Sequence, residues 1–238
     1  MTKFCLITDV HANLPALAAA LGAIQQEGYD RLIHLGDVVA IGPQPAECLD
    51  LLLNTPRISF IMGNHDAWLA EGLPQPRPPW LSAGEVRHQQ WTHAQIDPSL
   101  KEVVSAWPYY EEVVVENVPV ALVHYALDSS GRNFKQIVRE PTPLVLDYLF
   151  AAHDTELIFY GHHHPFSDEQ GASRYINPGS LGCHTEAVAR YTIAEFANGR
   201  YTITHKMVTY DDTALKRAFQ ERAVPERDFL WRVFFGGR

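Results

Sequence analysis

Short apolar runs alternate with segments of helical spacing along the first part of the chain. The apolar runs at residues 3–8, 31–35 and 57–62 have strand length, and helical patterns at residues 14–26 and 46–53 separate them. A short apolar run between a helix and a turn is typical of a buried parallel strand. The pattern therefore predicts strand–helix–strand units with right-handed crossovers in an α/β fold.

Residues 67–108 interrupt this alternation. They contain Trp68, Trp80 and Trp91, a proline-rich run at residues 74–79 and two stretches of helical spacing. We interpret the segment as a helical insertion within a single domain that spans residues 1–238. Its aromatic side chains could line a substrate pocket, but aromatics at helical spacing are more often core residues, and we favour that interpretation for most of them.

The second half of the chain is richer in strand patterns. Two β-rich runs within residues 109–125 and two more around Asn198-Gly199 predict hairpins. From residue 212 onward we expect an amphipathic helix packed on the sheet. The second hairpin is formed by residues 189–196 and 200–208. The remaining expected elements are a helix at residues 143–150 and short strands at residues 157–160 and 174–176.

Composition limits the classes of partner and compartment. The chain of 238 residues has a formal net charge of -9, which argues against a basic face for a nucleic-acid backbone. Its 3 cysteines are scattered without paired spacing, which fits a reducing compartment. No signal peptide and no apolar stretch of membrane-spanning length is evident. We therefore expect a cytoplasmic protein that does not bind a membrane.

Polar residues follow the predicted strands at the points where the strands end. In open α/β sheets these ends border the crevice in which ligands bind. Carboxylate and imidazole side chains together suit divalent Mn, Fe, Co, Ni or Zn, whereas Mg and Ca prefer oxygen alone. Two such ions would bind a phosphate ester and lower the pKa of a shared water, producing a hydroxide for in-line attack at phosphorus. The residues are Asp9, His11, Asp37, Asn64, His65, Asp66, His124, His162, His163 and His164.

In order and spacing, these motifs resemble those of the calcineurin-like metallophosphoesterases. A turn at residues 177–180, Asn-Pro-Gly-Ser, is often found in the small bacterial and archaeal phosphodiesterase-like members. The resemblance implies a four-layer α/β/β/α sandwich of two mixed β-sheets. The motifs that carry it are Asp9-x-His11, Gly36-Asp37, Gly63-Asn64-His65-Asp66, His124 and Gly161-His162-x-His164.

Carried over position by position, the resemblance implies a dinuclear metal centre with a bridging hydroxide nucleophile. Manganese is the expected metal, with Fe, Ni, Co or Zn as alternatives. Asp37 would bridge the ions, and His65 would face the phosphate, stabilise the developing charge and protonate the leaving oxygen, so these two are the expected catalytic residues. Asn64 and His65 would contact substrate, while Asp66 would orient either His65 or a neighbouring loop. One ion would be held by Asp9, His11, Asp37 and His164, the other by Asp37, Asn64, His124 and His162.

Two positions depart from the family pattern. His163 stands where a threonine or similar residue is common, and alternation along an extended segment points it away from its two neighbours. Tyr125 replaces a usual glycine, and we expect its bulk to narrow the pocket. Among the other histidines, His34 is expected in the core, and His88, His153 and His205 on the surface.

Three further residues are candidates for substrate contact. Asn13 follows the first motif, although a helix cap is the favoured interpretation of it. Arg132 lies in the loop beyond His124 and could bind a distal phosphate. His184, with Cys183, follows the Asn-Pro-Gly-Ser turn near the expected site.

The motifs predict phosphoester hydrolysis and leave the substrate open. A small phosphodiester or nucleotide-type ester is the favoured substrate, because the acidic chain makes a long nucleic acid less suitable. A phosphomonoesterase of the same fold is the alternative. A non-catalytic scaffold, like the retromer subunit that resembles this family, is less favoured because every expected ligand is present. A metallo-β-lactamase-like site would need a His-x-His-x-Asp-His run, which the sequence lacks. A homo-oligomer remains possible.

Overall fold

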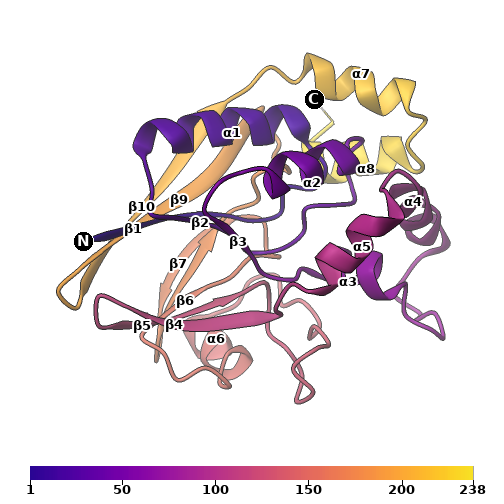
Figure 1. Ribbon diagram of the computed structural model, residues 1–238. Coiled ribbons are helices and arrows are strands. Elements are labelled where there is room, and N and C mark those ends of the chain that lie inside the picture. The colour runs from indigo at the N-terminus through magenta and orange to yellow at the C-terminus, as the bar shows by residue number, and fades with distance from the viewer. Residues whose placement is uncertain (238) are drawn as a thin grey trace.

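Two five-stranded sheets pack face to face between layers of helices (Figure 1). This computed structural model describes residues 1–237. The first sheet has the order β10-β9-β1-β2-β3 and the second the order β4-β5-β6-β8-β7. Both sheets are mixed, since each combines parallel and antiparallel pairs. The expected four-layer sandwich is confirmed.

The strands of the first sheet come from both ends of the chain. β1 pairs in parallel with β2, whereas on its other side it pairs antiparallel with β9. The bounds are Thr2–Ile7 for β1, Arg31–His34 for β2, Ile58–Phe60 for β3, Val188–Ala197 for β9 and Arg200–Thr209 for β10. The predicted hairpin around Asn198-Gly199 is confirmed as β9 and β10.

The second sheet comes from the middle of the chain. It contains the predicted hairpin β4–β5 and an edge strand, β7, that the sequence did not predict. β7 is polar and half exposed, so it lacks the apolar signal of a buried strand. The bounds are Tyr110–Val115 for β4, Val118–Val123 for β5, Leu157–Phe159 for β6, Phe166–Gln170 for β7 and Arg174–Pro178 for β8.

Alternation along the strands divides the core into layers. In β1, Phe4 and Leu6 point between the two sheets, while Cys5 and Ile7 pack under the helices. Helices α1 (Leu14–Glu27) and α2 (Pro45–Leu53) cover the outer face of the first sheet, and α6 (Pro143–Leu149) covers that of the second (Figure 1).

The remaining helices gather at the end of the sandwich toward which β1 runs (Figure 1). Three of them, α3 (Asn64–Glu71), α4 (Ala83–Ala94) and α5 (Pro98–Ser105), occupy the segment interpreted as an insertion. The core interpretation is wrong for Trp80, which is 65% exposed and stacks on the half-buried Trp68.

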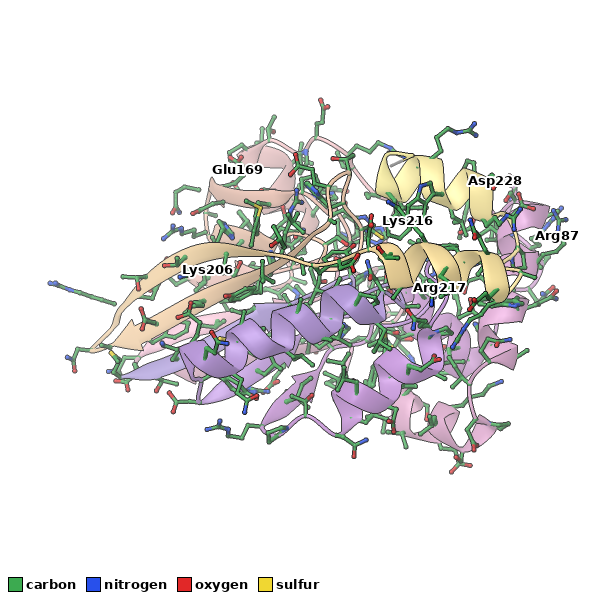
Figure 2. The ribbon with its side chains drawn as sticks, turned by 90° about the horizontal axis from the view of Figure 1, so that it is seen from above. Arg87, Glu169, Lys206, Lys216, Arg217 and Asp228 are labelled. Carbon is green, nitrogen blue, oxygen red and sulfur yellow. The ribbon has the colours of Figure 1, made fainter. Side chains whose placement is uncertain are left out.

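The C-terminal segment forms two helices, where one was expected. α7 (Thr213–Glu221) and α8 (Arg227–Phe235) are separated by a turn that contains Pro225, and proline cannot continue a helix. Seen from above in Figure 2, Arg87 of α4 lies near the start of α8, and its guanidinium pairs with Glu226.

We expected this segment to pack on the sheet, but the two helices pack on loops and on other helices instead. Their apolar residues enclose Ile41 and Cys183, two loop residues at the ends of strands, and Phe234 lies beside His164. His88 is therefore buried rather than on the surface, and its Nε2 accepts a hydrogen bond of 2.8 Å from Ile41 N–H.

Histidines outside the expected site vary in burial. His34 is a core residue as predicted, and its Nδ1 accepts a hydrogen bond from Gly36 N–H. Burial lowers the pKa of His34 to about 3, so its ring is neutral. His153 and His205 are half-buried rather than fully on the surface. Among residues 1–237, no helix has the length and apolarity needed to cross a membrane.

Asn13 connects the first helix to the C-terminal half of the chain. Its Oδ1 accepts from Ala16 N–H and caps α1, and its Nδ2 donates to Gly182 O at 2.7 Å and to Tyr210 Oη at 2.9 Å. The side chain is fully buried and its polar atoms are engaged, which favours a structural role over the suggested contact with substrate.

Replacing Asn13 by alanine removes the cap and leaves the buried Gly182 carbonyl without this donor. We expect Asn13→Ala to lower the free energy of unfolding by about 2–3 kcal/mol. Urea denaturation followed by circular dichroism measures the change. Asn54→Ala at the exposed end of α2 is the control, with an expected loss of about 0.5 kcal/mol or less. Equal losses in the two variants would contradict the role of Asn13.

Candidate metal centre

Most of the expected ligands sit on strained backbone just beyond a strand. Asp9, His11, Asp37, His162 and His164 all have positive φ angles, between 47° and 69°. Residues other than glycine rarely adopt this conformation, and where it persists in a structure it is concentrated at functional sites. This backbone conformation turns the polypeptide sharply just after each strand and so brings these side chains together.

A first group of donor atoms surrounds Asp9. His11 Nε2 and His164 Nε2 lie 3.1 Å apart, and each is 3.6 Å from Asp9 Oδ1. Asp9 Oδ2 accepts hydrogen bonds from Thr8 Oγ1 and His162 N–H, whereas Oδ1 is buried without a hydrogen-bond partner among the described residues. A buried carboxylate oxygen without a donor is costly, and a cation between these three side chains would satisfy it.

A second group lies on the other side of Asp37. Asp37 Oδ2 is 3.3 Å from His124 Nε2, and the ligand atoms of Asp37, His124 and His162 lie within 4.8 Å of one another. His124 Nδ1 is 2.7 Å from Leu35 O and donates to that carbonyl, so Nε2, which faces Asp37, is the nitrogen that a cation would bind in place of a proton. A hydrogen bond of this kind fixes the tautomer of a metal-binding histidine.

Asn64 completes the second group. The amide atom that points inward lies 3.0 Å from His162 Nδ1, 3.2 Å from His124 Nε2 and 3.3 Å from Asp37 Oδ2. A nitrogen at this position has two hydrogens to donate among the three atoms. An oxygen there faces Asp37 Oδ2 and two imidazole nitrogens, and a cation among these atoms would be bound by all of them, since amide oxygens are common metal ligands. The donor set therefore fits a divalent ion.

Asp66 holds the loop that carries Asp37. Its buried carboxylate accepts hydrogen bonds from Asp37 N–H at 2.7 Å, Val38 N–H at 3.0 Å and Gly63 N–H at 3.3 Å. Of the two roles considered for Asp66, the structure supports the orientation of a loop. Gly63 is required beside it, because a Cβ there would lie 2.2 Å from Asp37 N.

The electrostatics of the site favour two ionised carboxylates. Burial raises the pKa of Asp37, but the neighbouring His124 outweighs it, and the pKa lies well below its ordinary value. Burial likewise opposes ionisation of Asp9, but His11 and His164 lower its pKa. The pKa of His124 is raised to about 9, because Asp37 outweighs burial. The cluster is consequently suited to attract cations.

His65 lies beside both donor groups, but its surroundings differ from those of the expected metal ligands. It lies within 4.8 Å of donor atoms of His11 and Asp37, so distance alone does not separate it from the ligands. However, Gln89 Nε2 donates to His65 Nδ1 at 2.7 Å, which leaves the ring proton on Nε2. Gln89 is a buried residue of α4, and no motif in the sequence indicated it.

The two departures from the family pattern lie behind the site. His163 packs against Tyr125 and Tyr160 and belongs to none of the donor groups found among the described residues. The segment is not extended, as the alternation argument assumed, because His162 and His164 both have positive φ angles. Tyr125 is fully buried, and its ring lies against His162. The Tyr125 ring thus packs against a residue of the second donor group, and the expectation that its bulk narrows the substrate pocket stays a prediction.

Two other candidates lie outside the donor groups. Arg132 is exposed, pairs with Glu71 at 2.7 Å and lies over the Tyr109 ring. His184 is half-buried, and its Nδ1 accepts from Glu186 N–H. Neither contact tests a role in substrate binding, so both remain sequence predictions.

Comparison with known proteins identifies the family. Residues 2–223 match the calcineurin-like phosphoesterase superfamily domain. The chain belongs to this superfamily.

Similar proteins are found among curated relatives and solved structures. Phosphodiesterase YfcE of Escherichia coli K12 is 25% identical over 186 residues, covering 76% of this chain and 80% of the relative. A metallophosphoesterase from Sphaerobacter thermophilus has a TM-score of 0.68 at 25% identity, covering 94% and 95% of the two chains. The hypothetical protein PH1004 from Pyrococcus horikoshii OT3 has a TM-score of 0.81 at 18% identity, with both chains covered completely, and it shares the fold.

Asp37→Asn tests the shared carboxylate. Since Asp37 faces both donor groups, we expect its loss as an anion to reduce the total divalent metal retained after desalting from about two equivalents to fewer than one. Metal analysis of the purified variant measures this. Asp50→Asn, on the exposed face of α2, is the matched control and should retain the wild-type content. Two equivalents in Asp37→Asn would contradict the assignment.

Proposed function

We propose that the protein is a dinuclear metal-dependent phosphoesterase that hydrolyses a small phosphodiester or nucleotide-type ester. The observation that carries the proposal is the position of one oxygen, Asp37 Oδ2. It lies 3.9 Å from His11 Nε2 in the first donor group and 3.3 Å from His124 Nε2 in the second. A carboxylate between two donor groups is suited to link two cations.

Each group has the donors that a divalent ion takes. Asp9, His11, Asp37 and His164 would hold one ion, and Asp37, Asn64, His124 and His162 the other. Manganese is the expected ion, with Fe, Ni, Co or Zn as alternatives. Two such ions supply Lewis-acid binding of the phosphate oxygens and a water of lowered pKa as nucleophile.

His65 has the properties of a donor to the reacting phosphate. Its main-chain N–H donates to Asp37 Oδ1 at 2.9 Å, which fixes the residue beside the two donor groups. Gln89 holds the ring through Nδ1, so that Nε2–H is left to bind a phosphoryl or leaving-group oxygen. A pre-positioned donor of this kind stabilises charge that develops in the transition state.

The family and its relatives support ester hydrolysis and favour a diester. Phosphodiesterase YfcE is a relative, and the net charge of -9 favours a small substrate over a nucleic acid. A phosphomonoesterase is the alternative within the same fold. A non-catalytic scaffold is less favoured, because both donor groups are complete and the first contains a buried carboxylate oxygen, Asp9 Oδ1, without a hydrogen-bond partner among the described residues.

Hydrolysis of paired chromogenic substrates tests the proposal. Chelator-stripped protein is supplied with Mn²⁺ and given bis-p-nitrophenyl phosphate or p-nitrophenyl phosphate. We expect metal-dependent hydrolysis, faster with the diester. Preference for the monoester would favour the phosphatase alternative. A protein that binds two ions but hydrolyses neither compound nor any nucleotide diester would support the scaffold.

His65→Ala separates catalysis from metal binding. We expect the variant to retain its Mn²⁺ and lose about 100-fold or more in kcat, because a donor to the reacting phosphate is removed. Initial rates and metal analysis of the same sample give both quantities. His205→Ala is the control, since His205 lies on β10 and contacts Phe166 and Thr192. An unchanged kcat in His65→Ala would exclude His65 from the mechanism.

A further inference from the structure

We propose that Cys183 is a thiolate ligand of the first metal position, beside His11 and His164. This inference rests on the proposed dinuclear centre and deepens it. It adds a sulfur donor to one of the two positions, so the two ions would have different chemical surroundings.

The geometry brings the sulfur to the donor group. Cys183 Sγ and one ring nitrogen each of His11 and His164 lie within 4.8 Å of one another, and Cys183 is only 4% exposed. Asp9 Oδ1, which is buried and has no hydrogen-bond partner among the described residues, is 3.6 Å from Nε2 of both imidazoles. The sulfur therefore shares its two imidazole neighbours with an unsatisfied anion.

The backbone fixes Cys183 in this place. Leu181 N–H donates to Thr8 O and Gly182 N–H donates to Asp9 O, both at 3.0 Å. Cys183 N–H donates to Ser180 Oγ, which in turn donates to Asp9 O. The segment of residues 180–183 is thus bonded directly to the loop that carries Asp9.

The close approach of these two segments depends on glycine. A Cβ on Gly182 would lie 1.9 Å from Val10 O, a distance that no side chain can tolerate. Asn13 Nδ2 holds the same residue from the other side by donating to Gly182 O. The sulfur consequently has a defined position relative to Asp9.

The other two cysteines are core residues and provide a comparison for Cys183. Cys5 and Cys48 are fully buried among aliphatic side chains, and neither belongs to a donor group among the described residues. Cys183 also belongs to a cluster with apolar residues of α7 and α8, but unlike the other two cysteines it lies in a donor group with two imidazoles. These imidazoles distinguish Cys183 from a core residue.

A thiolate changes which ions the first position prefers. Sulfur donors favour Zn²⁺, Co²⁺ or Fe²⁺, whereas Mn²⁺ prefers oxygen. As the sulfur–metal bond forms, the thiol S–H bond breaks and its proton passes to solvent. The second position has only oxygen and nitrogen donors. The inference therefore predicts Mn²⁺ for the second position and a softer ion for the first.

Cobalt spectroscopy of the full-length protein tests this ligand directly. Chelator-stripped, reduced protein is titrated with Co²⁺, whose visible bands report binding and whose near-ultraviolet sulfur-to-metal band reports a thiolate. We expect the near-ultraviolet band to grow during the addition of only one of the two equivalents of Co²⁺. Cys183→Ser should lose this band and keep the visible bands, and Cys48→Ala, the control, should keep both.

The outcomes separate the ligand from the metal centre. Visible bands at two equivalents without a near-ultraviolet band in the wild type would overturn the role of Cys183 and leave the dinuclear centre intact. Failure to bind Co²⁺ at all would overturn both. The wild-type spectrum is sufficient for this decision even if Cys183→Ser does not fold. A band that persists in Cys183→Ser would assign the sulfur to another cysteine and overturn the inference.

Discussion

Two carboxylates that are buried next to one another impose the constraint on which this structure depends. Asp9 and Asp37 are at most 1% exposed, and both are held ionised. Anions in such surroundings are unfavourable unless donors or cations face them. The backbone N–H of His162, the hydroxyl of Thr8 and the backbone N–H of His65 supply part of that stabilisation. The imidazoles and the ions proposed between them would supply the rest.

Much of this arrangement could be predicted from sequence because it is local. An apolar run that ends in Gly36-Asp37 indicates a strand and the acid at its end without tertiary information, and the same holds for Asn64 after β3 and His124 after β5. The pairing of the two sheets was available only through the family resemblance, since periodicity does not report which faces pack together. That each expected ligand binds metal stays a prediction, which the geometry supports.

What could not be predicted depends on contacts between distant segments. His88 has a polar sequence context, yet it is buried because α4 lies against the loop at Ile41 under the C-terminal helices. Gln89 of α4 reaches His65 of α3 through a contact between two helices, and no spacing rule encodes that contact. The polar strand β7 forms because β8 offers it an edge, although its own residues carry no apolar alternation.

The position of β1 in the middle of its sheet has a consequence for biosynthesis. One edge of β1 pairs with β2, which follows it closely in the chain, but the other edge pairs with β9, from the C-terminal part of the chain. Contacts between such distant segments form late, because the intervening loop must close first. While the ribosome is still making the chain, Asp9 and His11 emerge long before His164 and Cys183. The donor group around Asp9 is therefore assembled only after the segments that carry His164 and Cys183 have left the exit tunnel.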